Sequence, residues 1–174
     1  MIETIFILLV VYQVKHFICD FPLQNSYMLG KFKPGLDFIL PLMAHASVHA
    51  GFTFLISSAF ILAHESPTWK GLLFISGLAI FDFVAHFTMD RIKASPKLLG
   101  RFKALSGTEY MECLNYLDPN IDRDYSPGEA YKNYLPLKNW QDKIKSNTYF
   151  WWALGIDQGV HHLTHYIIIW LLVC

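Results

Sequence analysis

Four long apolar segments dominate this chain and limit what it can fold into. They cover residues 2–21, 38–63, 69–93 and 149–174. A helix needs about 20 residues to cross the hydrocarbon core of a bilayer, and each segment is long enough. The sequence therefore predicts an all-α, polytopic membrane protein, with four transmembrane helices packed in a bundle as a single domain over residues 1–174.

Composition supports this class and excludes others. Hydrophobic residues make up 53% of the 174 residues and charged residues only 16%, which is too apolar for an average soluble domain. The first segment begins with Glu3, contains Lys15 and His16, and lacks a small-residue cleavage site, so we expect a retained helix rather than a signal peptide. The three cysteines show no paired spacing, and the net charge of +0 gives no support for nucleic-acid binding.

The basic residues predict an orientation. Most lysines and arginines lie in the connections after the first and third segments, whereas the connection between the second and third segments holds only Lys70. The flanking Lys15, Arg91 and Lys93 lie on the same side as the basic connections. Because basic loops remain in the cytoplasm, both termini are expected to be periplasmic or extracellular, and the insertion of residues 94–147 is expected to be cytoplasmic.

Two connections need separate comment. The insertion of residues 94–147 far exceeds the ordinary limit of about 12 to 15 residues, and such connections tend to be functional or disordered. Helix-like apolar spacing over residues 107–117 and a helix start at Ser126-Pro127 predict a helical extramembrane insertion. The first connection, residues 22–37, predicts a short piece lying on the lipid headgroups rather than a crossing.

Each apolar segment carries a stripe of ionisable residues spaced four apart. This spacing places them on one face of a helix, so each helix offers a pair or a triad to the bundle interior. With the basic connections on one side, the stripes fall in the same half of the bilayer. The stripes are His16 and Asp20; His45 and His49; Asp82, His86 and Asp90; and Asp157, His161 and His165.

These ten residues predict a metal site. A charge at the bilayer centre costs about 2.5 to 3.5 kcal/mol, so such groups need partners. Imidazole and carboxylate suit zinc or iron, and a cation supplies the charge that the aspartates lack. One or two transition-metal ions are expected. Asp157 and His165 lie about 12 Å apart along their helix and cannot share an ion, so some members either orient a ligating histidine or form a second site.

Other interpretations of these residues remain open. A hydrogen-bonded polar core or a proton relay without metal is the main alternative. Taken individually, His64 and His162 are expected to be ordinary hydrogen-bonded residues. Gln24, Gln158 and Lys93 lie close to the stripes and are candidates for orienting a ligand or facing a substrate.

The four stripes occur within a recognisable set of motifs. His16-Phe17-x-x-Asp20-Phe21-x-Leu23-Gln24, His45-x-x-x-His49, His86-x-x-x-Asp90-x-x-Lys93 and Asp157-Gln158-x-x-His161 follow in this order. The combination resembles an uncharacterised family of small integral-membrane proteins of bacteria and their phages, a domain of unknown function. The long insertion and the histidines after His161 look more like the phage-borne members. The resemblance implies a bacterial inner-membrane location and a polar core, but no reaction.

Several functions fit these features. The leading hypothesis is a metal-dependent membrane hydrolase acting on a lipid-linked or interfacial substrate, with Asp20, Asp90 or Asp157 as general base or bridging ligand. An oxidative di-iron enzyme ranks below it. A divalent-metal or proton transporter, which with four helices would work as a homo-oligomer, is the second class. A non-catalytic phage membrane effector is the third, and membrane lipids are the expected partners in every case.

Overall fold

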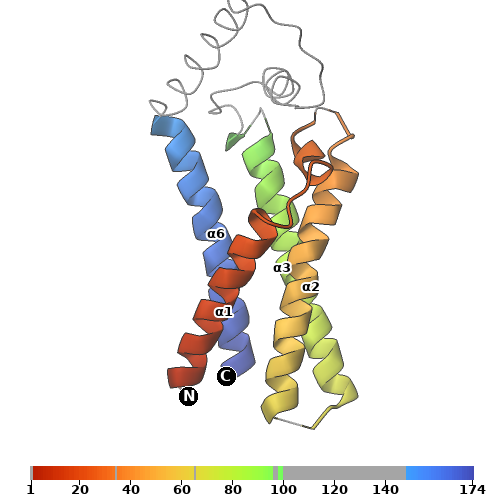
Figure 1. The fold of residues 1–174 in the computed structure, drawn as a ribbon, viewed down its shortest axis with the longest axis vertical. Coiled ribbons are helices and arrows are strands. Elements are labelled where there is room, and N and C mark those ends of the chain that lie inside the picture. Colours follow the sequence, from red (N-terminus) through yellow and green to blue (C-terminus); the bar gives the residue numbers. More distant parts are fainter. Residues whose placement is uncertain (1, 34, 65, 96–97, 100–147) are drawn as a thin grey trace, which may run out of the picture.

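The computed structural model of the protein describes residues 2–33, 35–64, 66–95, 98–99 and 148–174 (Figure 1). These parts of the chain contain helices and no β-strand. The long helices are α1 (Ile2–Asp20), α2 (Ile39–His64), α3 (Trp69–Ala94) and α6 (Thr148–Val173), and a 3₁₀ helix, η1 (Met28–Phe32), follows α1. Their ends lie within one residue of those predicted. The helices predicted inside the insertion lie outside the described residues.

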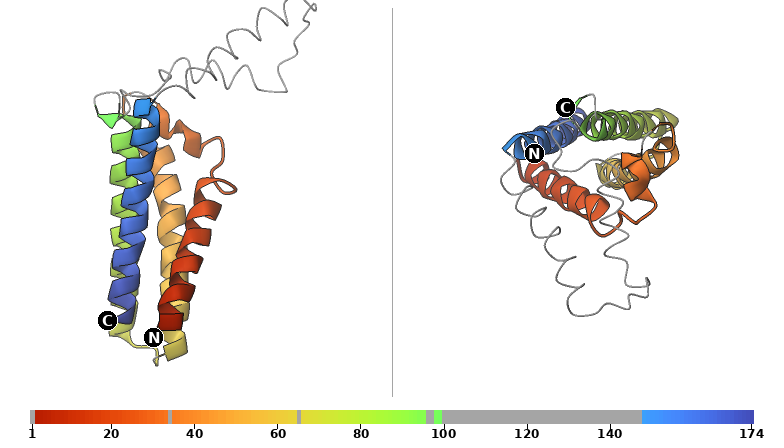
Figure 2. Two further views of the ribbon diagram at one scale, coloured as in Figure 1. Left: turned by 90° about the vertical axis from the view of Figure 1, so that its left-hand side faces the viewer. Right: turned by 90° about the horizontal axis from the view of Figure 1, so that it is seen from above.

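The four long helices alternate in direction. α1 packs beside α2 and α6, and α3 packs beside the same two helices. Both termini and the α2–α3 connection lie at one end of the bundle, whereas η1 and the start of α6 lie at the other (Figure 1). Viewed from above, the helices surround a common interior (Figure 2). This is the up-down-up-down arrangement of a four-helix bundle.

Apolar side chains cover the outside of the bundle and ionisable side chains lie inside it, as expected for a protein in a membrane. In α1, Phe6, Val10 and Val14 are exposed, whereas Lys15 and His16 are buried. α1, α2 and α3 are each long and apolar enough to cross a bilayer, by length and composition. α6 has the same length as α2 and α3, but an aspartate and three histidines interrupt its apolar sequence. The molecule therefore has membrane-type helices with polar groups turned inward.

Local sequence explains where the helices begin and end. Thr68 caps α3, because its Oγ1 accepts a hydrogen bond of 3.1 Å from the Gly71 backbone N–H. Pro41 lies in the first turn of α2, where a missing N–H costs nothing. Arg91 lies in the last turn of α3, where a cation interacts favourably with the helix dipole, and its guanidinium lies 3.6 Å from the centre of the Phe38 ring.

The helix η1 has five residues, which is too short to cross a membrane, as the sequence predicted. It packs against α2 and α3, and Gly30 and Lys31 are buried, whereas contact with the headgroups stays a prediction. A Cβ at Gly30 would lie 2.9 Å from Cγ of Pro41. Glycine therefore permits the close approach that carries Lys31 into the bundle.

The close contact between Gly30 and Pro41 predicts that alanine at Gly30 and alanine at Gly51 change the stability of the protein differently. Gly30→Ala should lower the free energy of unfolding by about 1 to 3 kcal/mol, because η1 or Pro41 must move. Gly51→Ala is the matched control, since a Cβ there meets nothing within 4 Å and alanine favours a helix by up to about 1 kcal/mol. Thermal unfolding in one detergent, followed by circular dichroism, compares them. Equal stability of the two variants would contradict the close packing of Gly30 against Pro41.

Candidate metal centre

All ten residues predicted as ligands lie inside the bundle. Nine are buried, and Asp20 is half-buried. They form four groups, in each of which one potential ligand atom per residue lies within 4.8 Å of the others. The groups are His16, His49 and His86; Asp20, His45 and His49; Asp82, His86 and His165; and Asp90, Asp157 and His161.

The first of these, here called the three-histidine group, combines His16 of α1, His49 of α2 and His86 of α3. The ring centroids of His49 and His86 are 3.8 Å apart, and that of His16 lies 5.6 Å and 6.0 Å from them. Each ring has one nitrogen bonded to an oxygen at 3.0 Å. The pairs are His16 Nε2 with Gln158 Oε1, His49 Nε2 with Asp20 Oδ1, and His86 Nδ1 with the Asp82 carbonyl.

These hydrogen bonds determine which nitrogen of each ring is free to bind a metal. A neutral imidazole has one N–H and one lone pair, so a nitrogen that donates to oxygen leaves the lone pair on the other. The opposite atoms are Nδ1 of His16, Nδ1 of His49 and Nε2 of His86. All three are buried and have no hydrogen-bond partner among the described residues. Histidines that bind metals are oriented in this way, so the three-histidine group fits a transition-metal ion.

Asp20 connects this group to the second one. Its Oδ1 lies 3.0 Å from His49 Nε2 and 3.4 Å from His45 Nε2, and its Oδ2 lies 3.2 Å from His16 Nε2. Its side chain is 18% exposed, whereas that of Asp90 is 4% exposed. Asp20 is therefore the aspartate of the four stripes that is most accessible from outside the bundle.

Three lysines pair with the other aspartates. Lys15 Nζ lies 2.7 Å from Asp82 Oδ2, and Lys31 Nζ lies 2.8 Å from Asp90 Oδ2. Lys93 pairs with Asp157. Three of the four aspartates therefore need no metal ion to supply the missing positive charge, contrary to expectation, because lysines supply it. Within the described chain, Asp20 has histidine partners and no lysine.

Lys15 and Lys31 were missed as members of the polar interior. Both were expected among the basic residues that set the orientation, yet both are buried. Lys15 gave a signal that was not used, since it lies inside a predicted crossing, where a charge requires a partner. Lys31 gave none, because it lies in a connection whose docking depends on tertiary packing.

The third group, here called the deep group, consists of Asp82, His86 and His165. Lys15 Nζ lies 3.1 Å from His165 Nε2 as well as contacting Asp82. Thr53 donates a hydrogen bond of 2.7 Å from Oγ1 to Asp82 Oδ2. Asp157 and His165 belong to different groups.

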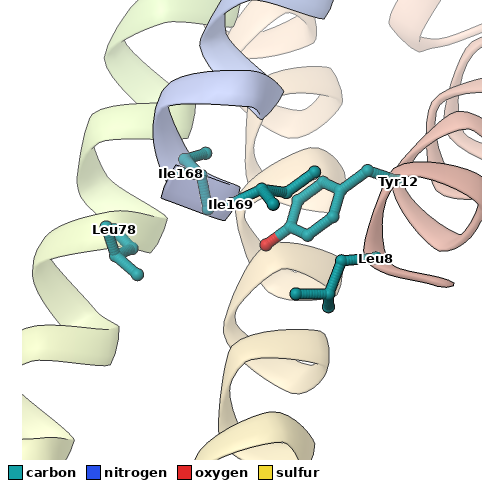
Figure 3. Packing of buried hydrophobic residues seen from close by; sticks show 5 residues of the cluster. All are labelled: Leu8, Tyr12, Leu78, Ile168 and Ile169. Carbon is teal, nitrogen blue, oxygen red and sulfur yellow. The ribbon is translucent and has the colours of Figure 1, made fainter. Parts of the chain in front are cut away.

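Buried side chains of α1, α3 and α6 form an apolar cluster in the interior (Figure 3). Tyr12 lies at the boundary, with its hydroxyl 3.4 Å from Ser57 Oγ. Along α6, His165 is followed one turn later by Ile169 in this cluster. His165 is thus the last ionisable member of its stripe. The cluster consists of Leu8, Tyr12, Leu78, Ile168 and Ile169.

The remaining polar candidates lie around these groups. Gln158 contacts His16, as described, and Lys93 has a side chain that is 24% exposed beside Asp157. Gln24 lies in the connection before η1, outside the four groups. His64 contacts the Phe60 carbonyl at the end of α2, and His162 contacts Gln13 of α1 at 3.2 Å.

No family model, curated protein or solved structure matches this chain. The resemblance to small membrane proteins of bacteria and phages therefore stays a prediction. The described residues form an all-helical, membrane-type bundle whose interior holds four histidine and aspartate groups that can hold a metal ion.

Proposed function

We propose that the protein is a membrane-embedded, metal-dependent hydrolase whose zinc or iron ion is held by His16, His49 and His86. One observation carries the proposal: each imidazole is fixed by a hydrogen bond at one nitrogen and has a buried, unpaired nitrogen at the other. Three protein ligands leave a fourth position open. That is the arrangement of catalytic rather than structural zinc sites.

The aspartates around the three-histidine group are assigned either to proton transfer or to stabilising the bundle. A metal ion of this kind supplies a water molecule that ionises near neutral pH. Asp20 is the best general base, because it has no lysine partner in the described chain and is partly exposed. Asp90 and Asp157 are paired with Lys31 and Lys93, and therefore stabilise the bundle next to the site rather than accept protons.

The apolar cluster supports catalysis over transport. A carrier must open its site to both sides of the membrane, whereas here the stripe of α6 ends at His165 and is followed by the apolar cluster. In this proposal α6 is the fourth crossing, and the three-histidine group is reached from the end that carries η1. The positive-inside rule assigns that end to the cytoplasm of a bacterial inner membrane.

A polar pair between α1 and α6 supports a substrate that comes from the lipid. Gln13 is exposed on α1, and its Nε2 lies 3.2 Å from Nδ1 of His162. The His162 ring is 5.4 Å from that of His16. An exposed amide on a membrane helix is costly unless it is used, so a lipid-linked ester or phosphoester can approach the three-histidine group beside it.

Metal analysis tests the proposal. Wild type purified in mild detergent without chelators should carry stoichiometric zinc or iron, and so should His64→Ala, whose histidine lies outside the four groups. His49→Ala and His86→Ala should lose the ion, and with it hydrolysis of a panel of carboxylic-ester and phosphoester lipids in mixed micelles. A metal-free wild type would refute the proposal. A metal-loaded protein that cleaves no lipid but moves ions into liposomes would favour transport.

A further inference from the structure

The deep group differs from the three-histidine group in that a cation already lies within it. Lys15 Nζ contacts two of its three members, Asp82 Oδ2 at 2.7 Å and His165 Nε2 at 3.1 Å. The side chains of Lys15 and Asp82 are only 1% and 0% exposed. The ammonium group is thus fully inside the bundle, bound to the atom types that a transition metal would use.

The other two lysine–aspartate pairs involve fewer partners. Lys31 contacts only Asp90 among the described ligand residues, and Lys93 contacts only Asp157. Neither ammonium group bonds to a histidine nitrogen. Lys15 alone of these three lysines therefore lies between a carboxylate and an imidazole, as a bound cation would.

The deep group also retains free binding capacity. Asp82 Oδ1 and His165 Nδ1 are buried and have no hydrogen-bond partner among the described residues. Asp82 Oδ1 lies 3.1 Å from Nδ1 of His86 and 3.8 Å from Nε2 of His165. Removing the lysine charge would leave the Asp82 carboxylate and the His165 imidazole close together in a dry interior, and both are donors that suit zinc or cobalt.

We infer that the deep group is a second metal site, and that the Lys15 ammonium occupies it as a built-in cation. The protein then takes one transition-metal ion rather than two. This rests on the proposed three-histidine centre only for the identity of the first ion. Lys15 also acts as a positioning residue: it holds the carboxylate of Asp82, whose other oxygen, Oδ1, lies 3.1 Å from Nδ1 of His86.

Cobalt binding measures the number of sites. Full-length protein in detergent is dialysed against Co²⁺, and the bound ion is counted by elemental analysis and by its visible absorption. Wild type should saturate at one ion per chain and Lys15→Met at two, since methionine has a similar length and no charge. Lys15→Met/Asp82→Asn should return to one. Unfolding temperature gives a second readout, because cobalt should stabilise Lys15→Met more than it stabilises wild type.

The outcomes separate this inference from the proposed function. A single ion in both wild type and Lys15→Met overturns the inference and leaves the three-histidine centre intact. No ion in wild type but one in Lys15→Met refutes the proposed function and supports the inference, whereas no ion in either refutes both. If Lys15→Met does not fold, the Co²⁺ content of wild type under excess metal is the test. A second tightly bound ion in wild type overturns the inference, and saturation at one ion supports it.

Discussion

Asp82→Ala should lower the free energy of unfolding by about 3 to 5 kcal/mol, because removing one partner of a buried ion pair leaves the other charge uncompensated. The stranded group is the Lys15 ammonium, which lies 2.7 Å from Asp82 with a side-chain exposure of 1%. Thr53 loses the acceptor of its hydroxyl in the same variant. Reversible unfolding in mixed micelles, with sodium dodecyl sulfate as denaturant, measures the loss.

Two further variants show whether the unpaired charge of Lys15 causes the loss of stability in Asp82→Ala. Lys15→Met/Asp82→Leu removes both charges and should be near wild type or more stable, since buried ion pairs are often replaced by apolar residues without loss. Asp37→Ala, at an exposed aspartate, should change stability by no more than about 0.5 kcal/mol. An Asp82→Ala variant as stable as Asp37→Ala would show that the pair contributes nothing.

Asp20→Asn should slow hydrolysis by about 10² to 10⁴-fold, which is the usual contribution of a positioned general base. Metal content should persist, because the asparagine oxygen can still accept the hydrogen bond that Asp20 Oδ1 takes from His49 Nε2 at 3.0 Å. The measurement is single-turnover hydrolysis of the best lipid ester in the panel, with metal content determined on the same sample.

Asp157→Asn is the matched comparison for this prediction. Asp157 belongs to a ligand group but is paired with Lys93, so its replacement should affect stability more than rate. A slow Asp157→Asn variant beside an active Asp20→Asn variant would move the role of general base from Asp20 to Asp157.

The sequence predicted the bundle well because hydropathy and helical spacing are local properties. Apolar length located the four long helices, and the four-residue repeat placed His16, His86 and their companions on inward faces. Which nitrogen of each ring is free could not be predicted, since it depends on contacts between helices. Gln158 of α6 fixes the His16 ring of α1, although the two residues lie far apart in the chain.

The charge balance of the interior could not be predicted from the sequence. Six histidines and four aspartates suggested that a metal cation supplies the missing charge, because Lys15 was counted as a helix flank and Lys31 as a loop residue. Spacing carries no information on how far η1 folds back, and that fold brings Lys31 to Asp90. With three aspartates balanced internally, the case for metal rests on unpaired histidine nitrogens rather than on charge.

The apolar cluster also has an electrical consequence. In a membrane, most of the transmembrane voltage falls across the part of a protein that excludes water and ions, and a full crossing is worth about 2.3 kcal/mol per charge at 100 mV. The buried cluster of Leu8, Leu78 and Ile168 would act as such a part in the proposed function, in which cations enter from the η1 end. A cation that binds at His16 would then cross little of the field, and we expect its binding to follow concentration rather than membrane voltage.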